Sequence, residues 1–189
     1  MTDATPVPWW RRGPLFEIVE TVAVTLVLFL VIQAFIAQPY QVEGDSMERT
    51  VEPQQYVLVD KLSPRFDAYH RGDIVVFRPP EGFQRGDTPF IKRVIGVAGD
   101  EVELRDGGVV VNGTAIDEPY AYADPPGSTP EATISSGPTS WQVPDGAVFL
   151  LGDHRTDSED SRVFGPVSTS QVLGRAWLRY WPLSAFGPV

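Results

Sequence analysis

The 189-residue sequence contains no cysteine, which excludes disulfide bonds and thiolate metal sites. Lysine is also scarce, because only two of the 15 basic residues are lysines. The formal net charge is -10, whereas phosphate binding needs a concentrated basic surface. We therefore expect no nucleic-acid partner.

Histidine is the third scarce residue, with only His70 and His154 in the chain. His70 lies in a polar run over residues 67–72, and His154 is flanked by charged residues, so we expect both to be solvent-facing loop side chains. A serine nucleophile needs a nearby base, and these two histidines offer few choices. His154 stays open as a second candidate for that base.

The abundant residues indicate a mainly β fold with many loops. Eighteen prolines and 17 glycines separate apolar runs that are rich in β-branched residues. An Asp-Gly turn at residues 106–107 predicts a hairpin. The expected strands cover residues 56–60, 73–77, 90–97, 101–104, 109–111, 147–151 and 172–181.

One long apolar run dominates the N-terminal part of the chain. Residues 15–37 have the sequence LFEIVETVAVTLVLFLVIQAFIA, which as a helix is long enough to cross a hydrocarbon core of about 30 Å. We predict a cytoplasmic tail over 1–14, a transmembrane helix over 15–37 and an extracytoplasmic domain over 38–189. Arg11 and Arg12 precede the run, and positive charge at that end favours a cytoplasmic N-terminus.

Two other interpretations of this run are weaker. A cleaved secretory signal has a shorter apolar core and small residues before the cut, but Phe35 stands three positions before the bond that follows Ala37. A core helix of a soluble protein is seldom apolar on every face over such a length. A permanent anchor in the lipid bilayer is therefore the favoured interpretation.

Residues 120–144 form a stretch rich in proline, glycine and serine. The stretch is too polar to build a core of its own, and the chain after it is too short to fold alone. We predict a surface loop excursion within one domain rather than a linker between two.

A serine and a lysine are candidates for a catalytic pair. Ser46 lies in a glycine turn a few residues beyond the apolar run, and its hydroxyl is a weak nucleophile until a base removes the proton. Lys92 lies in a predicted strand, on the same face as Phe90 and Val94, because strand side chains alternate. Desolvation on an apolar face favours neutral lysine, which can accept that proton.

Residues 152–162 form a polar turn with several carboxylates. A calcium site is unfavourable, because the acid spacing differs from that of a calcium loop and the interleaved arginines repel a cation. Asp160 and Arg162 can instead pair and hold the turn, and a serine hydroxyl in it can orient a neutral lysine.

These candidates lie in segments that follow one another in a characteristic order. The segments are Gly44-Asp45-Ser46-Met47, Gly72-Asp73-Ile74-Val75-Val76-Phe77, Ile91-Lys92-Arg93-Val94-Ile95-Gly96 with Gly99-Asp100, and Gly152-Asp153-x-Arg155 leading to Ser158-x-Asp160-Ser161-Arg162. In this order behind an apolar anchor, they resemble the signature boxes of bacterial type I signal peptidases of family S26. Each box is weak alone, but the four together are specific, and the resemblance runs from about residue 15 to the C-terminus.

The resemblance implies a membrane-anchored serine/lysine endopeptidase with a fold of antiparallel coiled β-sheets. Such an enzyme removes signal peptides from exported preproteins at the outer face of the cytoplasmic membrane. The implied substrates carry small side chains one and three positions before the cut. No metal and no cofactor is expected.

The resemblance also implies a role for individual residues. Ser46 is the expected nucleophile and Lys92 the expected general base. The supporting roles are implied for Ser158, which would orient Lys92, for Asp160 and Arg162, which would brace the site, and for Gly44 and Met47 at substrate-binding or oxyanion positions.

The chain departs from the family pattern at three positions. Gly44 stands where a serine or threonine hydroxyl often helps to hold the oxyanion, so the backbone amide of Ser46 becomes the chief donor. Arg49 replaces a frequent proline, which loosens the backbone restraint after the nucleophile. His154 stands where asparagine is frequent.

Two alternatives from other classes stay open. One is a soluble self-cleaving relative, like the repressor proteases of the SOS response that share a serine/lysine dyad, although the spanning segment counts against it. The other is a membrane-anchored binding module that has kept the scaffold without activity. Gly44 and Arg49 favour this second alternative slightly.

Overall fold

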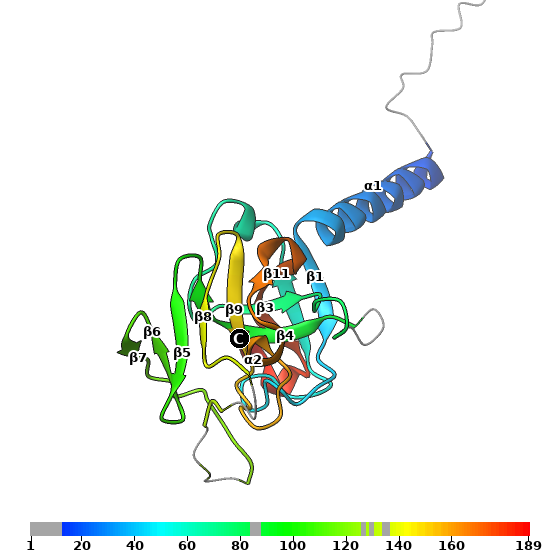
Figure 1. Cartoon of the computed structure of the whole chain (residues 1–189). Coiled ribbons are helices and arrows are strands. Elements are labelled where there is room, and N and C mark those ends of the chain that lie inside the picture. The colour runs from blue at the N-terminus through cyan, green and yellow to red at the C-terminus, as the bar shows by residue number, and fades with distance from the viewer. Residues whose placement is uncertain (1–12, 84–87, 126–127, 129–130, 134–136) are drawn as a thin grey trace, which may run out of the picture.

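The chain folds into one apolar helix and a β domain, as the computed structural model shows (Figure 1). The structure describes residues 13–83, 88–125, 128, 131–133 and 137–189. Among these residues the strands are antiparallel and form a curled larger sheet and a smaller sheet. The predicted fold class, a mainly β protein behind one N-terminal apolar helix, is confirmed.

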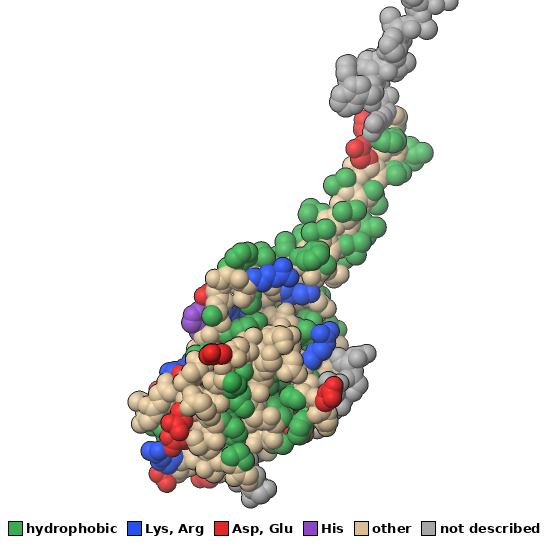
Figure 2. All heavy atoms as spheres, turned by 45° about the horizontal axis from the view of Figure 1, so that its top comes forward, with side chains coloured by type: hydrophobic (Ala, Val, Ile, Leu, Met, Phe, Trp, Pro, Cys, Tyr) green, Lys and Arg blue, Asp and Glu red, His purple; other side chains and the backbone are tan. Residues whose placement is uncertain are grey.

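Helix α1 (Pro14–Phe35) projects away from the β domain (Figure 1). Its 22 residues give a length of about 33 Å at 1.5 Å per residue, and none of them is buried. Figure 2 shows apolar side chains along the whole helix and acidic ones only near its N-terminal end. By length and composition α1 can cross a membrane.

The helix ends two residues before the predicted end of the span. Ala37 already belongs to β1 (Ala37–Gln41), where it pairs with Asp60 of β2 (Tyr56–Asp60). This pairing with a strand some 20 positions later could not be deduced from the apolar run itself.

The larger sheet has the strand order β1-β2-β11-β3-β4-β9-β10, and β12 pairs with β11. Strand β11 (Val172–Trp181) lies between β2 and β3, so the last long strand joins the first strands of the domain. The other strands of this sheet are β3 (Ile74–Phe77), β4 (Phe90–Val97), β9 (Ala147–Leu151), β10 (Val167–Ser168) and β12 (Gly187–Pro188).

The smaller sheet has the order β7-β6-β5-β8. Strands β5 (Glu101–Arg105) and β6 (Gly108–Val111) form the predicted hairpin. Its turn residues Asp106 and Gly107 have φ angles of 53° and 78°, the left-handed conformation that Asp-Gly turns provide. The flanking strands are β7 (Thr114–Ala115) and β8 (Ser140–Gln142).

Residues 120–144 differ in part from the predicted surface excursion. Strand β8 lies inside this range and pairs with β5, and several side chains of the range are buried, namely Tyr122, Ala123, Ala132 and Val143. These apolar residues fall in short groups separated by proline, glycine and polar residues, so they show no sustained periodicity that would predict burial. Residues 126–127, 129–130 and 134–136 lie outside the described part of the chain.

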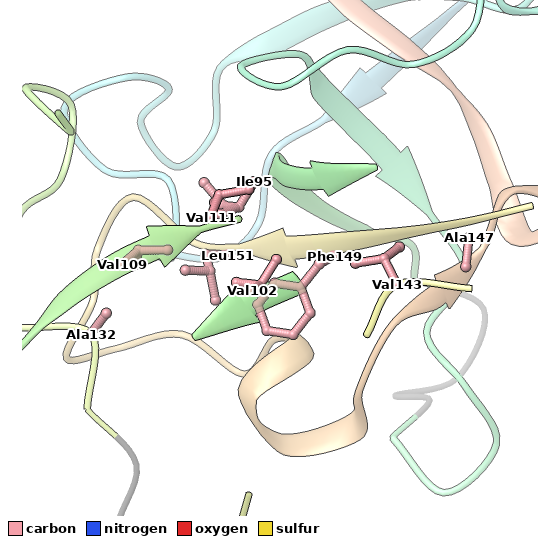
Figure 3. Close-up of a cluster of buried hydrophobic side chains, with 9 residues drawn as sticks. All are labelled: Ile95, Val102, Val109, Val111, Ala132, Val143, Ala147, Phe149 and Leu151. Carbon is pink, nitrogen blue, oxygen red and sulfur yellow. The ribbon is translucent and has the colours of Figure 1, made fainter. Parts of the chain in front are cut away.

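Strand β9 is buried on both of its faces. Phe149 and Leu151 point into the cluster of Figure 3, which lies between the larger sheet and strands β5 and β6. Val148 and Leu150 alternate with them and belong to a second cluster, together with Phe77 of β3. The neighbouring strand β4 is therefore held between two apolar layers, and β4 carries Lys92.

Candidate active site

Ser46 lies in the turn that follows β1. Val42, at the entry of the turn, donates its N–H to Gln55 and accepts the N–H of Gln54. Directly after the serine, Met47 is fully buried in the core cluster beneath β2 and β3. The Met47 side chain therefore anchors the turn, so its predicted substrate-binding or oxyanion role would have to involve the backbone.

The fold brings Lys92 to Ser46 across 46 positions of sequence. The Nζ of Lys92 lies 2.6 Å from the Oγ of Ser46, within hydrogen-bond distance. Lys92 projects from β4 opposite Val75 of β3, and Phe90 and Val94 contribute to the cluster on its side of the sheet. The arrangement of Ser46 beside a strand lysine with apolar neighbours agrees with the predicted dyad.

The surroundings of Lys92 favour its neutral form. The residue is 4% exposed, and this burial lowers the pKa of Lys92 from 10.5 to about 8. The negative charges of Asp160 and Glu159 act in the opposite direction but do not cancel the desolvation. A lysine with such a pKa is partly neutral at mildly alkaline pH and can serve as a proton acceptor.

The polar turn at residues 152–162 is a buried network centred on Asp160. The Asp160 carboxylate accepts hydrogen bonds from Nε and Nη2 of Arg162, each at 2.8 Å, and from the amide of Gly152 at 3.0 Å. Asp160 also caps the short helix α2 (Ser161–Phe164). Both Asp160 and Arg162 are buried, so the pair holds the turn as the sequence suggested.

Ser158 belongs to the same network. Its hydroxyl donates to Asp160 at 2.7 Å. Among the hydrogen bonds of the described residues, none joins Ser158 to Lys92, although both line one cleft. The orienting role of Ser158 stays a prediction. Ser158 could act on Lys92 indirectly, because it donates a hydrogen bond to Asp160, whose charge raises the pKa of Lys92.

A second buried network, centred on Asp153, was not predicted from the sequence. Asp153 is fully buried, accepts two hydrogen bonds from Arg93 at 2.8 and 2.6 Å, and accepts the hydroxyl of Thr50 at 2.6 Å. Arg93 follows Lys92 in β4 and Thr50 ends the turn of Ser46. The network therefore connects strand β4, which carries Lys92, to the turn that carries Ser46. The sequence signal that could have indicated this network is Arg93, a charged residue directly after the candidate base Lys92 in a predicted strand.

The two histidines have different environments. His70 is exposed near Asp67, as predicted. His154 is only 2% exposed, so the prediction of a solvent-facing side chain is wrong. Its ring packs on Tyr122 with 4.5 Å between centroids, and its backbone N–H donates to the carbonyl of Ser46 at 3.0 Å. These contacts join segments far apart in sequence, which local charge around residue 154 does not reveal.

Arg49 is held more firmly than its sequence context suggested. Its φ is 71°, a conformation that proline cannot adopt, and its N–H donates to the Glu52 carboxylate at 3.1 Å. The guanidinium carbon lies 3.7 Å from the centroid of the Tyr122 ring. These contacts restrain the turn after Ser46 in place of a proline ring.

A cleft of about 800 Å³ opens at the pair of Ser46 and Lys92. A Cβ added at Gly44 would meet no atom within 4 Å. Among the described hydrogen bonds, the amide of Ser46 donates to none, so it is available to an oxyanion. The lining residues come from three segments: Tyr40 to Ser46, Thr88 to Lys92 and Thr156 to Glu159, together with Val57, Val76 and Val163.

Comparison with known proteins gives a consistent result. The family model described as "Signal peptidase, peptidase S26" matches residues 15–181. A signal peptidase I of Leptolyngbya laminosa is 35% identical over 179 residues, which cover 93% of this chain and 84% of that protein. Signal peptidase IB of Staphylococcus aureus is 33% identical over 192 residues, covering 93% of this chain and 94% of that protein.

A crystal structure is similar to part of the chain as well. A signal peptidase I from Enterococcus faecalis aligns with a TM-score of 0.45 and 33% sequence identity. The alignment covers 58% of this chain and 97% of that one.

Proposed function

Because the chain belongs to the signal peptidase S26 family, we propose that it is a membrane-anchored type I signal peptidase in which Ser46 is the nucleophile and Lys92 the general base. The observation that carries the residue assignment is the 2.6 Å distance between the Ser46 hydroxyl and the amine of a buried lysine in a cleft. The lowered pKa of Lys92 supports the same assignment.

The reaction is an acyl transfer in two stages. Neutral Lys92 takes the proton of Ser46 as the serine oxygen attacks the scissile carbonyl, and the amide of Ser46 stabilises the oxyanion. Protonated Lys92 then gives its proton to the leaving amine, which releases the new N-terminus. Water, deprotonated by the same lysine, attacks the acyl-enzyme ester and restores free Ser46.

The proposed substrates are exported preproteins with small side chains one and three positions before the cut. The family resemblance implies this preference, and apolar cleft residues such as Val57, Val76 and Ile91 suit short apolar side chains. The test is cleavage of a synthetic preprotein with an Ala-x-Ala site by the purified full chain in detergent. Replacing either alanine of that site with tryptophan should abolish cleavage, and Ser46→Ala enzyme is the control. Equal cleavage of the tryptophan substrates would contradict the proposed specificity.

The proposed orientation places the N-terminus in the cytoplasm and the catalytic domain outside. Arg11 and Arg12 motivate it, and they lie outside the described residues. Protease added to intact cells or spheroplasts should digest the domain after residue 38 and leave the tail at 1–14 protected. Exchange of both arginines for glutamate should weaken this bias. A reporter fused at residue 189 that is active only in the cytoplasm would contradict the orientation.

The rate of cleavage should fall at acidic pH because only neutral Lys92 can act as base. Since the folded-state pKa of Lys92 is lowered to about 8, activity should be lost as pH falls through that value rather than through 10.5. The pH profile of kcat/KM measures this limb. His154→Asn should leave the limb in place, and a limb that disappeared with His154 would transfer the role of base to the histidine.

Gly152→Ala should damage the site without removing a catalytic group. A Cβ at Gly152 would overlap the Ser158 hydroxyl and approach the carbonyl of Ser46 to 2.6 Å. A displacement of about 1 Å at the nucleophile can cost about 10²-fold in rate, so a loss of that order is expected. Gly187→Ala is the matched control, because a Cβ there meets nothing within 4 Å. Wild-type kcat in Gly152→Ala would show that the close packing does not position Ser46.

A further inference from the structure

The ring of His154 is buried without a hydrogen-bond partner among the described residues. No described residue forms a hydrogen bond with Nδ1 or Nε2, and only 3% of the side chain is exposed to solvent. Leaving a buried polar atom unpaired costs about 1–3 kcal/mol, so an unpaired buried imidazole needs a physical reason. The Ser46–Lys92 mechanism does not use this ring.

Each nitrogen of the ring faces a carboxylate. Nδ1 lies 3.6 Å from Oε2 of Glu48, and Nε2 lies 3.2 Å from Oδ2 of Asp124. The other oxygen of Asp124 accepts the hydroxyl of Tyr122, which orients the carboxylate towards the ring. Three segments that are distant in sequence therefore place an imidazole and two carboxylates together.

A neutral imidazole cannot satisfy this arrangement. It has one N–H donor and one lone pair, so only one nitrogen can donate to a carboxylate and the other presents its lone pair to the second. A positive charge between these groups removes the repulsion. The charge can be a proton on the ring or a metal ion bound by a ring nitrogen and both carboxylates.

We propose that His154, Glu48 and Asp124 form a binding site for a divalent transition-metal ion of the zinc class. Each residue offers one ligand atom, and these atoms lie within 4.8 Å of one another. Ligand atoms about 2.0–2.2 Å from a tetrahedral zinc ion lie about 3.3–3.6 Å apart, so one carboxylate must rotate towards the ring nitrogen that binds the ion. The side chains of Glu48 and Asp124 are 36% and 54% exposed, so Glu48 can rotate towards the ion while Tyr122 orients Asp124, and water can fill the remaining position.

The ligand set favours zinc-class ions over calcium or magnesium. Imidazole nitrogen suits zinc, copper and nickel, whereas calcium and magnesium prefer oxygen ligands alone. Arg49 brings a positive charge near the site, because its guanidinium stacks on the ring of Tyr122, which packs on His154. Its repulsion should weaken binding, so Arg49→Gln should bind the ion more tightly than the wild type.

An ion at this site would brace the turn of the nucleophile. Glu48 is two residues after Ser46, and the backbone N–H of His154 already donates to the Ser46 carbonyl. Asp124 belongs to the segment of Tyr122, which is bridged to His154. Binding would cross-link the three segments, so it should raise the thermal stability of the protein in proportion to the logarithm of the free metal concentration.

The test is titration of the chelator-treated full chain in detergent with ZnCl₂, followed by calorimetry and thermal unfolding, with Co²⁺ absorption as a report on coordination. We expect one ion per chain and a rise in Tm. His154→Asn should abolish binding, and Glu48→Gln and Asp124→Asn should each weaken it by at least about 10-fold. The carboxylate variants keep the test decisive if His154→Asn fails to fold, because these side chains are partly exposed.

His70→Asn is the matched control, because His70 is the other histidine of the chain and also lies near an acid, but is exposed. It should leave Zn²⁺ binding and the rise in Tm unchanged. Binding that is lost in His70→Asn, or that survives in all three ligand variants, would overturn the proposal. So would a pH-dependent stability that vanishes in His154→Asn without any saturable metal binding, since a proton would then occupy the place assigned to the ion.

Discussion

Ser46→Ala and Lys92→Ala are each expected to reduce preprotein cleavage to near the background rate while leaving the protein folded. The two groups act as one unit across a 2.6 Å contact, so removal of either should cost about as much as removal of both. For the lysine, loss of a general base alone accounts for about 10²- to 10⁴-fold. Single-turnover rates on a synthetic preprotein, with thermal unfolding as the check on folding, measure these effects.

Two further variants sharpen this prediction. Lys92→Arg should also be inactive, because arginine keeps its proton in a protein and cannot act as a base. Lys61→Ala is the matched control, since Lys61 is the other lysine of the chain and its amine contacts Gln38, 3.3 Å away, instead of the cleft. A double variant markedly slower than either single variant would contradict a dyad. A wild-type protein without cleavage activity would support the binding-module alternative.

Asp160→Ala should lower the free energy of unfolding of the domain by more than any surface substitution does. It removes the acceptor of Arg162, Ser158 and the Gly152 amide, and it leaves the Arg162 guanidinium buried without its charge partner. Breaking one side of a buried ion pair costs about 3–5 kcal/mol in the free energy of unfolding. Urea unfolding measures this loss. Glu103→Ala is the control, because Arg105, its partner, is exposed and such pairs contribute about 1 kcal/mol or less.

Asp160 should also affect the base itself, which a purely structural residue would not. Its charge raises the pKa of Lys92, so its removal should lower that pKa further. Asp160→Asn, which keeps the shape of the side chain, should therefore shift the acidic limb of the cleavage profile below pH 8. A limb that stays in place or moves to higher pH would show that the Asp160 charge does not act on Lys92.

Local sequence determined the long helix and the main strands of this protein. Strands rich in apolar residues, such as those at 90–97 and 147–151, were observed with the predicted bounds. An apolar run of spanning length predicted α1, and an Asp-Gly turn predicted the hairpin of β5 and β6. These features depend on side-chain periodicity, chain length and turn conformation, which are properties of neighbouring residues.

The sequence also determined which residue types were available for chemistry. With no cysteine, two histidines and two lysines, few bases could serve Ser46, and alternation along β4 placed Lys92 with Phe90 and Val94. The pairing of Asp160 with Arg162 could also be predicted from the sequence, because the two residues are only two positions apart.

Only the tertiary structure decided how deeply the polar residues lie. The turn at 152–162 has the composition of a solvent-exposed loop, yet His154, Asp153 and Asp160 are buried. They are buried because Tyr122, Thr50 and the strand of Lys92 pack against them from distant parts of the chain, and local composition carries no information about such partners. The same long-range packing sets the distance from Ser46 to Lys92 and buries Met47 beneath the turn. It also pairs β8, which lies in the polar stretch at 120–144, with β5 of the smaller sheet.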